Sequence, residues 1–431
     1  MFHAERAQER ARHGRVILVR IETSPEDIRG MQAAAGILTA RGGMTSHAAL
    51  VARQMGKVCV SGAGELEIDY KHRTLKAAGR TLKEGEFVSL DGSTGEVFAG
   101  ELATQPSEVL EVLFARGAKK RGGPAYRAYA ELLSWADAVR TLGVRANADQ
   151  GDQAETALAF GAEGIGLCRT EHMFFEGQKI DAMREMILAD TPAERERALA
   201  KLLPLQRADF AEIFRAMGPF PVTIRTLDPP LHEFLPHEEH EISFLARDMG
   251  LSFDKLKARV EALKEQNPML GHRGCRLGIA FPEITRTQAR AIFEAACDVA
   301  RATKRKPKPE VMIPLVGTKK ELELQAAVVR AVAEQVFAEK KLRLPYLVGT
   351  MIELPRAALT AGEIAQAAEF FSFGTNDLTQ TTYGISRDDG GKFIPQYVAL
   401  EIFGADPFAR LDRAGVGRLL RIACEEGRAT R

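Results

Sequence analysis

Short apolar runs alternate with longer amphipathic stretches from residue 144 to the end of the chain. Continuous apolar runs are typical of parallel strands buried on both faces, and stretches such as 287–302 and 319–340 have helical spacing. The pattern predicts seven strands, at residues 144–147, 164–169, 222–225, 269–273, 311–315, 347–353 and 370–375. Seven strands that alternate with helices indicate a (β/α)₈ TIM barrel over residues 143–431 that lacks its last strand–helix unit.

The first part of the chain predicts a separate small α/β domain over residues 1–105. Its predicted elements are a polar helix up to residue 12, a helix that begins at Ser24-Pro25, strands at 16–20, 36–39, 58–60, 74–76 and 87–90, and a hairpin turn at 91–95. Residues 106–142 return to a helical pattern that a charged, glycine-containing stretch interrupts. We interpret this segment as a helical linker between the two domains.

A glycine–serine loop precedes one short helical pattern in the small domain. Glycines 42–43 allow a turn that brings backbone close to a phosphate, and Thr45 and Ser46 are residue types that cap helices. Apolar residues then recur at helical spacing until Gly56, where a helix commonly stops. The pattern therefore predicts that His47 lies in the first turn of a short helix.

That position gives His47 a specific chemistry. The positive end of the helix dipole disfavours an imidazolium, so the ring stays neutral and nucleophilic near pH 7. Free N–H groups of the first turn would also stabilise a phosphoryl group attached to the ring. We interpret His47 as a phosphoryl-accepting nucleophile. The alternative for a single histidine at this position is that it only packs or caps the helix.

Polar residues gather where the predicted barrel strands end, which is where such barrels carry catalytic groups. They are Arg169, Arg225, Arg273, Glu353, Asn376 and Asp377. Arginines bind phosphate and carboxylate through paired hydrogen bonds, and carboxylates are hard ligands suited to Mg²⁺. The set fits a small phosphorylated carboxylic acid. Taken singly, an arginine here is more often a salt-bridge partner, and a carboxylate may only cap a helix.

Composition excludes several classes of protein. Hydrophobic residues make up 45% and charged residues 27% of the chain, and the net charge of +1 gives no reason to expect nucleic acid as a partner. No apolar run approaches the roughly 20 residues of a membrane span. The five cysteines form no CxxC pair, so we expect a reduced, cytoplasmic protein without a disulfide framework.

Five histidines lie in the second half, at positions 172, 232, 237, 240 and 272. The spacing of His237 and His240 could indicate a pair of metal ligands. Metal sites need three or four convergent ligands, however, and no further ligand matches this spacing. We therefore expect these histidines to be solvated or to lie at helix starts.

Motifs along nearly the whole chain resemble one known family. The segment at residues 36–62 is similar to the phosphohistidine motif of the PEP-utilising enzymes, and in detail to their pyruvate, phosphate dikinase branch. Segments similar to the PEP/pyruvate-binding barrel of that branch lie at residues 166–172, 225–232, 271–276, 349–353 and 373–380.

The resemblance implies roles for individual residues. Arg169, Arg225 and Arg273 would bind or activate a phosphoryl group, and Glu353 and Asp377 would hold Mg²⁺. The substrate pocket would be lined by Gly374, Thr375, Asn376 and Asp377. Thr45 would be a regulatory phosphosite, as in some members of the family.

The resemblance also implies an activity and partners. The family reaction converts ATP, pyruvate and phosphate into AMP, PEP and diphosphate through a phosphohistidine, and family members commonly form homodimers through the barrel. The family's ATP-binding region and a C-terminal segment with an acid/base cysteine have no counterpart here. We therefore expect this chain to supply the phosphohistidine and PEP/pyruvate half only, with ATP and phosphate handled elsewhere.

Two other functions stay open at this stage. A PEP–protein phosphotransferase uses a similar histidine domain and barrel but passes the phosphoryl group to a carrier protein. The chain could also be a non-catalytic phosphocarrier or regulatory fragment that binds PEP without turnover.

Overall fold

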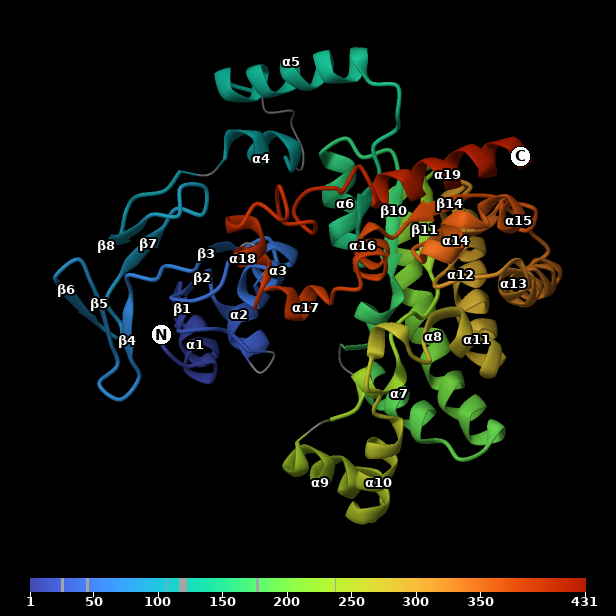
Figure 1. Cartoon of the computed structure of the whole chain (residues 1–431), viewed down its shortest axis with the longest axis horizontal. Coiled ribbons are helices and arrows are strands. Elements are labelled where there is room, and N and C mark those ends of the chain that lie inside the picture. Colours follow the sequence, from blue (N-terminus) through green and yellow to red (C-terminus); the bar gives the residue numbers. More distant parts are fainter. Residues whose placement is uncertain (25–26, 44–45, 106, 116–121, 176–177, 237) are drawn as a thin grey trace. The chain divides into compact units, whose positions relative to one another are not determined.

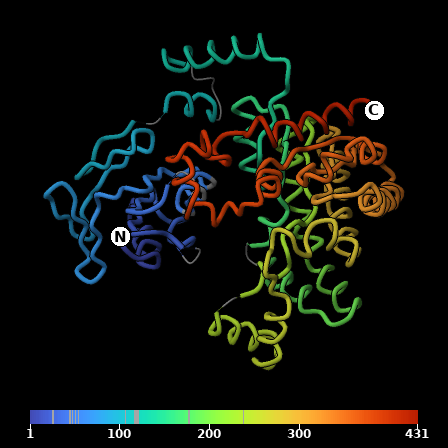
Figure 2. The backbone as a smooth tube through the Cα atoms, in the orientation of Figure 1, coloured from blue at the N-terminus to red at the C-terminus, as the bar shows by residue number. Residues whose placement is uncertain are grey.

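The chain divides into two units, residues 1–111 and residues 112–431. The computed structural model describes residues 1–24, 27–43, 46–105, 107–115, 122–175, 178–236 and 238–431. Figure 1 labels the helices and strands, and Figure 2 follows the backbone of the same chain.

The small unit contains a parallel sheet of three strands with helices packed against it. The strands, in sheet order, are β1 (Ile17–Arg20), β2 (Gly36–Thr39) and β3 (Val58–Ser61). The helices are α1 (Ala4–Ala11), α2 (Ile28–Ala33) and α3 (His47–Gln54). Every residue of the central strand β2 is buried, as expected for a strand covered on both faces. These three strands and the first helix confirm the sequence prediction, whereas the predicted helix start at Pro25 lies outside the described residues.

Antiparallel strands complete the small unit. One three-stranded sheet comprises β4 (Glu67–Asp69), β5 (Thr74–Ala77) and β6 (Arg80–Lys83), and β7 (Val88–Leu90) pairs with β8 (Val97–Ala99). The turn predicted between the last two strands is present, because Gly95 donates its N–H to the carbonyl of Asp91 at 2.9 Å. β4 and β6 were not predicted; they are short, and their residues alternate only weakly between buried and exposed.

The large unit is built on one curled sheet of six parallel strands, which confirms the expected incomplete barrel. Neighbouring strands follow the chain order: β9 (Ala146–Asn147), β10 (Ile165–Arg169), β11 (Pro221–Arg225), β12 (Lys308–Ile313), β13 (Leu347–Ile352) and β14 (Phe371–Phe373). Main helices on this sheet are α6 (Gly151–Ala159), α8 (Pro192–Met217), α12 (Pro282–Thr303), α13 (Lys319–Lys340) and α19 (Val416–Thr430) (Figure 1).

The core of the large unit lies between the sheet and these helices. The ring of Phe293 on α12 packs edge-on against Tyr346 and Phe337, with ring centroids 4.9 and 5.5 Å apart. β12 and β13 are buried at every position after their first residue. Such two-sided burial holds the strands in place, so the side chains that follow their ends are carried on a rigid frame.

The remaining helices lie in the connections before, between and after these elements along the chain. They are α4 (Glu108–Leu113), α5 (Pro124–Val139), η2 (Thr170–Phe175), α7 (Lys179–Leu188), η3 (Leu231–Phe234), α9 (Glu239–Asp248), α10 (Phe253–Leu263), η4 (Pro268–Leu270), α11 (Gly274–Ala280), α14 (Pro355–Leu359), α15 (Ala361–Ala365), α16 (Thr375–Tyr383), α17 (Arg387–Gly390) and α18 (Ile394–Ala399). No helix in the described part of the chain is long and apolar enough to cross a membrane.

The strand predicted at residues 269–273 was wrong. Residues Pro268–Leu270 form the 3₁₀ helix η4, and Arg273 is the residue immediately before α11. β11 and β12 pair directly with each other over five residues, so no strand position exists between them. Pro268 lacks an N–H for a sheet ladder, and Gly274 adopts a left-handed backbone with φ 58°.

A capping box at the start of α13 predicts a measurable contribution to stability. Thr318 Oγ1 accepts from the Glu321 N–H at 3.3 Å, and Glu321 Oε2 accepts from the Thr318 N–H at 2.8 Å. We expect Thr318→Ala to lower the free energy of unfolding by about 1 kcal/mol, because an N–H of the first turn loses its partner. Urea denaturation measures the change. Thr318→Ser keeps the hydroxyl, so an equal loss in that variant would contradict the explanation.

Candidate active site

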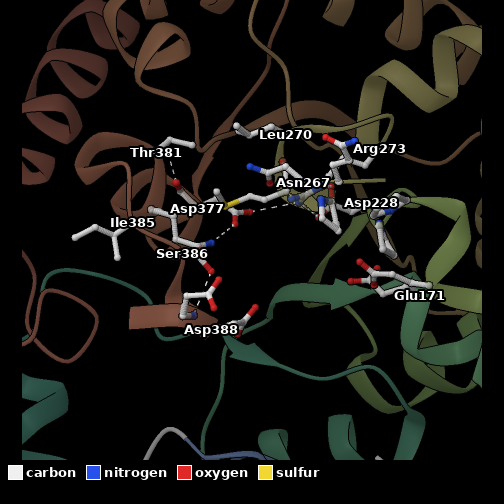
Figure 3. Close-up of a pocket in the computed structure, with 18 of the residues that line it drawn as sticks. Glu171, Asp228, Asn267, Leu270, Arg273, Asp377, Thr381, Ile385, Ser386 and Asp388 are labelled. Atoms are coloured by element: carbon white, nitrogen blue, oxygen red, sulfur yellow. Dashed lines mark hydrogen bonds and ion pairs between the residues drawn. The ribbon is translucent and has the colours of Figure 1, made fainter. Parts of the chain in front are cut away.

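A cavity of about 950 Å³ opens at the carboxyl ends of the strands of the large unit. Its lining comes from the loops after β10 and β11, from η4, and from α16 and the residues that follow it (Figure 3). In parallel sheets these ends meet at one edge, so side chains far apart in sequence converge there. Glu171, Asp228, Arg273, Asp377 and Asp388 are among the charged residues that line it.

Asp228 is the centre of a buried ion-pair cluster beside the cavity. Its Oδ2 accepts from Arg225 Nη1 at 2.8 Å and from Arg273 Nη2 at 2.6 Å, and its Oδ1 accepts from Arg273 Nε at 3.2 Å. Arg225 also pairs with Glu171, and Arg273 Nη2 lies 3.4 Å from Asp377 Oδ2. Two guanidinium groups are therefore fixed in orientation by three carboxylates that come from separate loops.

Glu353 lies fully buried next to this cluster. Its Oε1 accepts from the Leu315 N–H at 2.6 Å, while its Oε2 is a buried oxygen with no hydrogen-bond partner in the described chain. Burial, followed by the nearby carboxylates of Asp228 and Asp377, raises the pKa of Glu353 well above its usual range, against the opposing effect of Arg225. Glu353 is therefore favoured as the neutral acid, and its ionised form requires a cation close to Oε2.

The backbone around Glu353 is adapted to hold its carboxyl group. Leu315, whose N–H binds Glu353, has a left-handed backbone with φ 60°, which is strained for a branched side chain. A Cβ at Gly374 would lie 2.7 Å from Glu353 Cβ and 2.8 Å from Glu353 Oε2. Position 374 therefore needs glycine because the backbone passes directly against this carboxyl group.

In the small unit, the predicted short helix begins at His47 as α3. Ser46 is its N-cap, and the Ser46 hydroxyl accepts from the Ala49 N–H at 3.4 Å. Gly42 and Gly56 have left-handed backbones, with φ 114° and 62°. The prediction that His47 stands in the first turn is confirmed for the backbone. The side chain of His47 and the predicted phosphosite Thr45 lie outside what the structure describes.

The residues predicted for the barrel site divide into three groups. Arg273 and Asp377 line the cavity, and Arg225 and Glu353 are buried against it. Arg169 ends β10 opposite Arg225, and its N–H donates to Asp149 at 2.6 Å, but its side chain is not among the described residues that line the cavity. The third group, Gly374, Thr375 and Asn376, lies where β14 passes into α16, with Thr375 and Asn376 exposed.

Sequence reasoning missed the carboxylates that orient the arginines. Glu171 follows Arg169 by two residues, and Asp228 follows Arg225 by three. A carboxylate just after a strand-end arginine was a signal that could have found both. Arg387 was also missed: its Nη1 donates to Asn376 Oδ1 at 2.8 Å. Nothing in the sequence pattern near Arg387 indicated this contact.

His172, for which a solvated or helix-start role was expected, lies in the 3₁₀ helix η2 and is 37% exposed, and it also has a carboxylate partner. Its Nδ1 lies 2.7 Å from Asp149 Oδ2, and its ring lines the cavity. His240, by contrast, is exposed near the start of α9, as expected. His237, the other member of the predicted spacing, is outside the described residues. Within the described ranges, no group of three or more His, Cys, Asp and Glu side chains is arranged to hold a metal ion.

Comparison with known proteins identifies the family. Residues 125–431 match the PEP-binding domain of PEP-utilising enzymes, and residues 13–95 match the mobile domain of the same enzymes. The chain therefore belongs to the PEP-utilising enzyme family, as the sequence motifs predicted.

Two relatives within the family are pyruvate, phosphate dikinases. The chain is 53% identical over 431 residues to pyruvate, phosphate dikinase of Clostridium symbiosum. The matched region covers 100% of this chain and 48% of that protein. It is 54% identical over 432 residues to pyruvate, phosphate dikinase of Rhizobium meliloti (strain 1021), covering 100% of this chain and 46% of that protein. The chain thus spans about half the length of the curated relatives it matches.

The close approach at Gly374 predicts a large effect of one methyl group. We expect Gly374→Ala to lower the free energy of unfolding by about 1–3 kcal/mol, because the added Cβ overlaps Glu353. Gly362→Ala on α15 is a matched control, since its Cβ would meet nothing nearer than 3.5 Å. Urea denaturation of both variants measures the difference. Equal stability of the two variants would contradict the argument.

The pKa of Glu353 predicts how stability depends on pH. Because this pKa is raised on folding, the folded chain keeps a proton that the unfolded chain releases. The resulting stabilisation is complete below the usual glutamate pKa and is lost as pH rises through the folded-state value. Glu353→Gln cannot ionise, so we expect its stability relative to the wild type to increase as the pH rises above the usual glutamate pKa. Urea denaturation without divalent cations tests this, and a difference that stays constant with pH would contradict it.

Proposed function

We propose that the chain is the phosphohistidine and PEP/pyruvate half of a pyruvate, phosphate dikinase-type phosphotransferase. Its own reaction would be the exchange of a phosphoryl group between PEP and His47. The observation that carries this proposal is the pair of guanidinium groups held by Asp228 beside a strand-end cavity that also contains Asp377. Oriented arginines next to carboxylates fit a ligand that carries both phosphoryl and carboxylate groups.

In this proposal the arginines bind the transferring group. Arg225 and Arg273, assisted by Arg169, neutralise charge on the phosphoryl oxygens, and their carboxylate partners keep them from turning away. His47 supplies the accepting nitrogen at the start of α3, where N–H groups stabilise the attached phosphoryl group. Thr375 and Asn376 bind the carboxylate or enolate end of the ligand, and Arg387 holds the Asn376 amide in place.

Glu353 and Asp377 fit a Mg²⁺ ion. Glu353 presents a buried oxygen without a hydrogen-bond partner in the described chain, and its pKa is raised by burial and then by the carboxylates of Asp228 and Asp377. A divalent cation would offset the cost of ionising it. Two carboxylates suffice for Mg²⁺, which usually keeps waters and binds substrate oxygens as further ligands. When bound, Mg²⁺ supplies positive charge to the oxygens of the ligand.

Wider features of the family are part of the same proposal. The complete reaction, from ATP, pyruvate and phosphate to AMP, PEP and diphosphate, would need an ATP-binding region, and a homodimer in the cytoplasm is expected. Thr45 would serve as a regulatory phosphosite. We assign proton transfer at the methylene carbon to no residue here, because none of the five cysteines of the chain is among those that line the cavity.

Incubation with Mg²⁺ and PEP labelled in its phosphoryl group tests the proposed function. We expect an acid-labile label on His47 that is absent from His47→Ala and reduced at least about a hundredfold in Asp377→Asn, since that variant loses a charged ligand. Glu334→Gln, which changes a surface carboxylate paired with Arg343, is the matched control and should label normally.

Other outcomes would replace the proposal. A folded wild-type chain that binds PEP without labelling would instead be a non-catalytic phosphocarrier or regulatory fragment. Passage of the label from His47 to a carrier protein, and not back to pyruvate, would make the chain a PEP–protein phosphotransferase.

A further inference from the structure

His172 and Asp149 form a pair at the edge of the cavity. Asp149 follows β9, and His172 lies in η2 after β10, so both stand at the carboxyl ends of neighbouring strands. His172 Nδ1 is 2.7 Å from Asp149 Oδ2, and the Asp149 side chain is largely buried. A carboxylate on Nδ1 fixes the ring orientation and leaves Nε2 as the free nitrogen.

The pair is anchored independently of the histidine. Asp149 Oδ1 accepts the Arg169 N–H at 2.6 Å, and the Asp149 N–H donates to Gln153 Oε1 at 2.9 Å. The His172 side chain remains 37% exposed and lines the cavity. Its ring is therefore supported from behind by a fixed carboxylate, and it has room to meet a ligand.

Acidic side chains outnumber basic ones in the lining of the cavity, so binding of an anionic ligand would be helped by a further positively charged group. Six lining residues are carboxylates: Glu171, Asp228, Glu233, Asp377, Asp388 and Asp389. Arg273 is the one arginine or lysine among the described lining residues, and its guanidinium is already engaged by Asp228 and Asp377. An anionic ligand would meet an excess of negative charge there. His172 is the other residue of the lining that can carry a positive charge.

We propose that His172 binds the phosphoryl end of the substrate as an imidazolium, whose Nδ1–H donates to Asp149 and whose Nε2–H donates to the substrate. The proposal deepens the proposed function and rests on it. The phosphoryl end is favoured because His172 adjoins Glu171, which holds Arg225, and Asp149 binds the backbone of Arg169. Both arginines belong to the set proposed to bind the phosphoryl group.

Two amide variants separate the nitrogens of the ring. His172→Asn places an amide near the position of Nδ1, so it can keep the bond to Asp149 while removing the nitrogen that faces the cavity. His172→Gln places an amide near the position of Nε2 and keeps a neutral donor toward the cavity. His240→Gln, on the exposed surface of α9, is the matched control.

Calorimetric titration with Mg²⁺ present, using PEP and pyruvate as separate ligands, tests the proposal. We expect His172→Asn to raise the Kd for PEP about tenfold, the size of a lost charge-assisted hydrogen bond, and to leave the Kd for pyruvate unchanged. His172→Gln should recover part of the PEP affinity, and His240→Gln should match the wild type.

Contrary outcomes are distinguishable. Wild-type affinity of His172→Asn for PEP, or an equal loss for PEP and pyruvate, would overturn the role of His172 while leaving the proposed function in place. Failure of the folded wild-type chain to bind PEP would overturn the proposed function, and this inference with it.

Discussion

The candidate site depends on one buried carboxylate. Asp228 is only 3% exposed and bonds to both Arg225 and Arg273. A buried charge is tolerated only when it is paired and hydrogen-bonded, and Asp228 is the one partner that both arginines share. The ion pairs in turn connect the loop after β11, the start of α11 and the start of α16. The ion pairs that offset the cost of burying the two arginines therefore also hold these three segments together around the cavity.

The backbone of the sheet brings the residues of this ion-pair cluster close together. Six parallel strands in chain order bring their carboxyl ends to one edge, and β11 carries Arg225 into register with Arg169 on β10. Glu353 follows β13, where the left-handed backbone of Leu315 directs an N–H to it and Gly374 leaves it space. Regular strands therefore set the positions approximately, and a few unusual backbone conformations set the final distances.

The sequence predicted most of the elements but few of the contacts. β13 is a largely apolar run, which a two-sided sheet requires, and it was predicted at nearly the correct bounds. The strand expected at 269–273 failed because apolar residues beside Pro268 and Gly271 form a 3₁₀ turn instead. Strand-end arginines could be recognised as an anion site. Their carboxylate partners could not be paired from sequence, since Arg273 and Asp377 are 104 residues apart and only the topology brings them together.

The hydroxyl that caps α3 has a second partner in the sheet of the small unit. Ser46 Oγ lies 2.8 Å from Ser61 Oγ, which ends β3, and Thr39 at the end of β2 contacts the same Ser61 hydroxyl at 3.3 Å. The first turn of the helix is thereby tethered to two strands, so it cannot rotate or slide on its own without breaking this hydroxyl chain. A group attached to that turn would therefore move together with strands β2 and β3. Loss of the pairing between these strands would also remove the support of the turn.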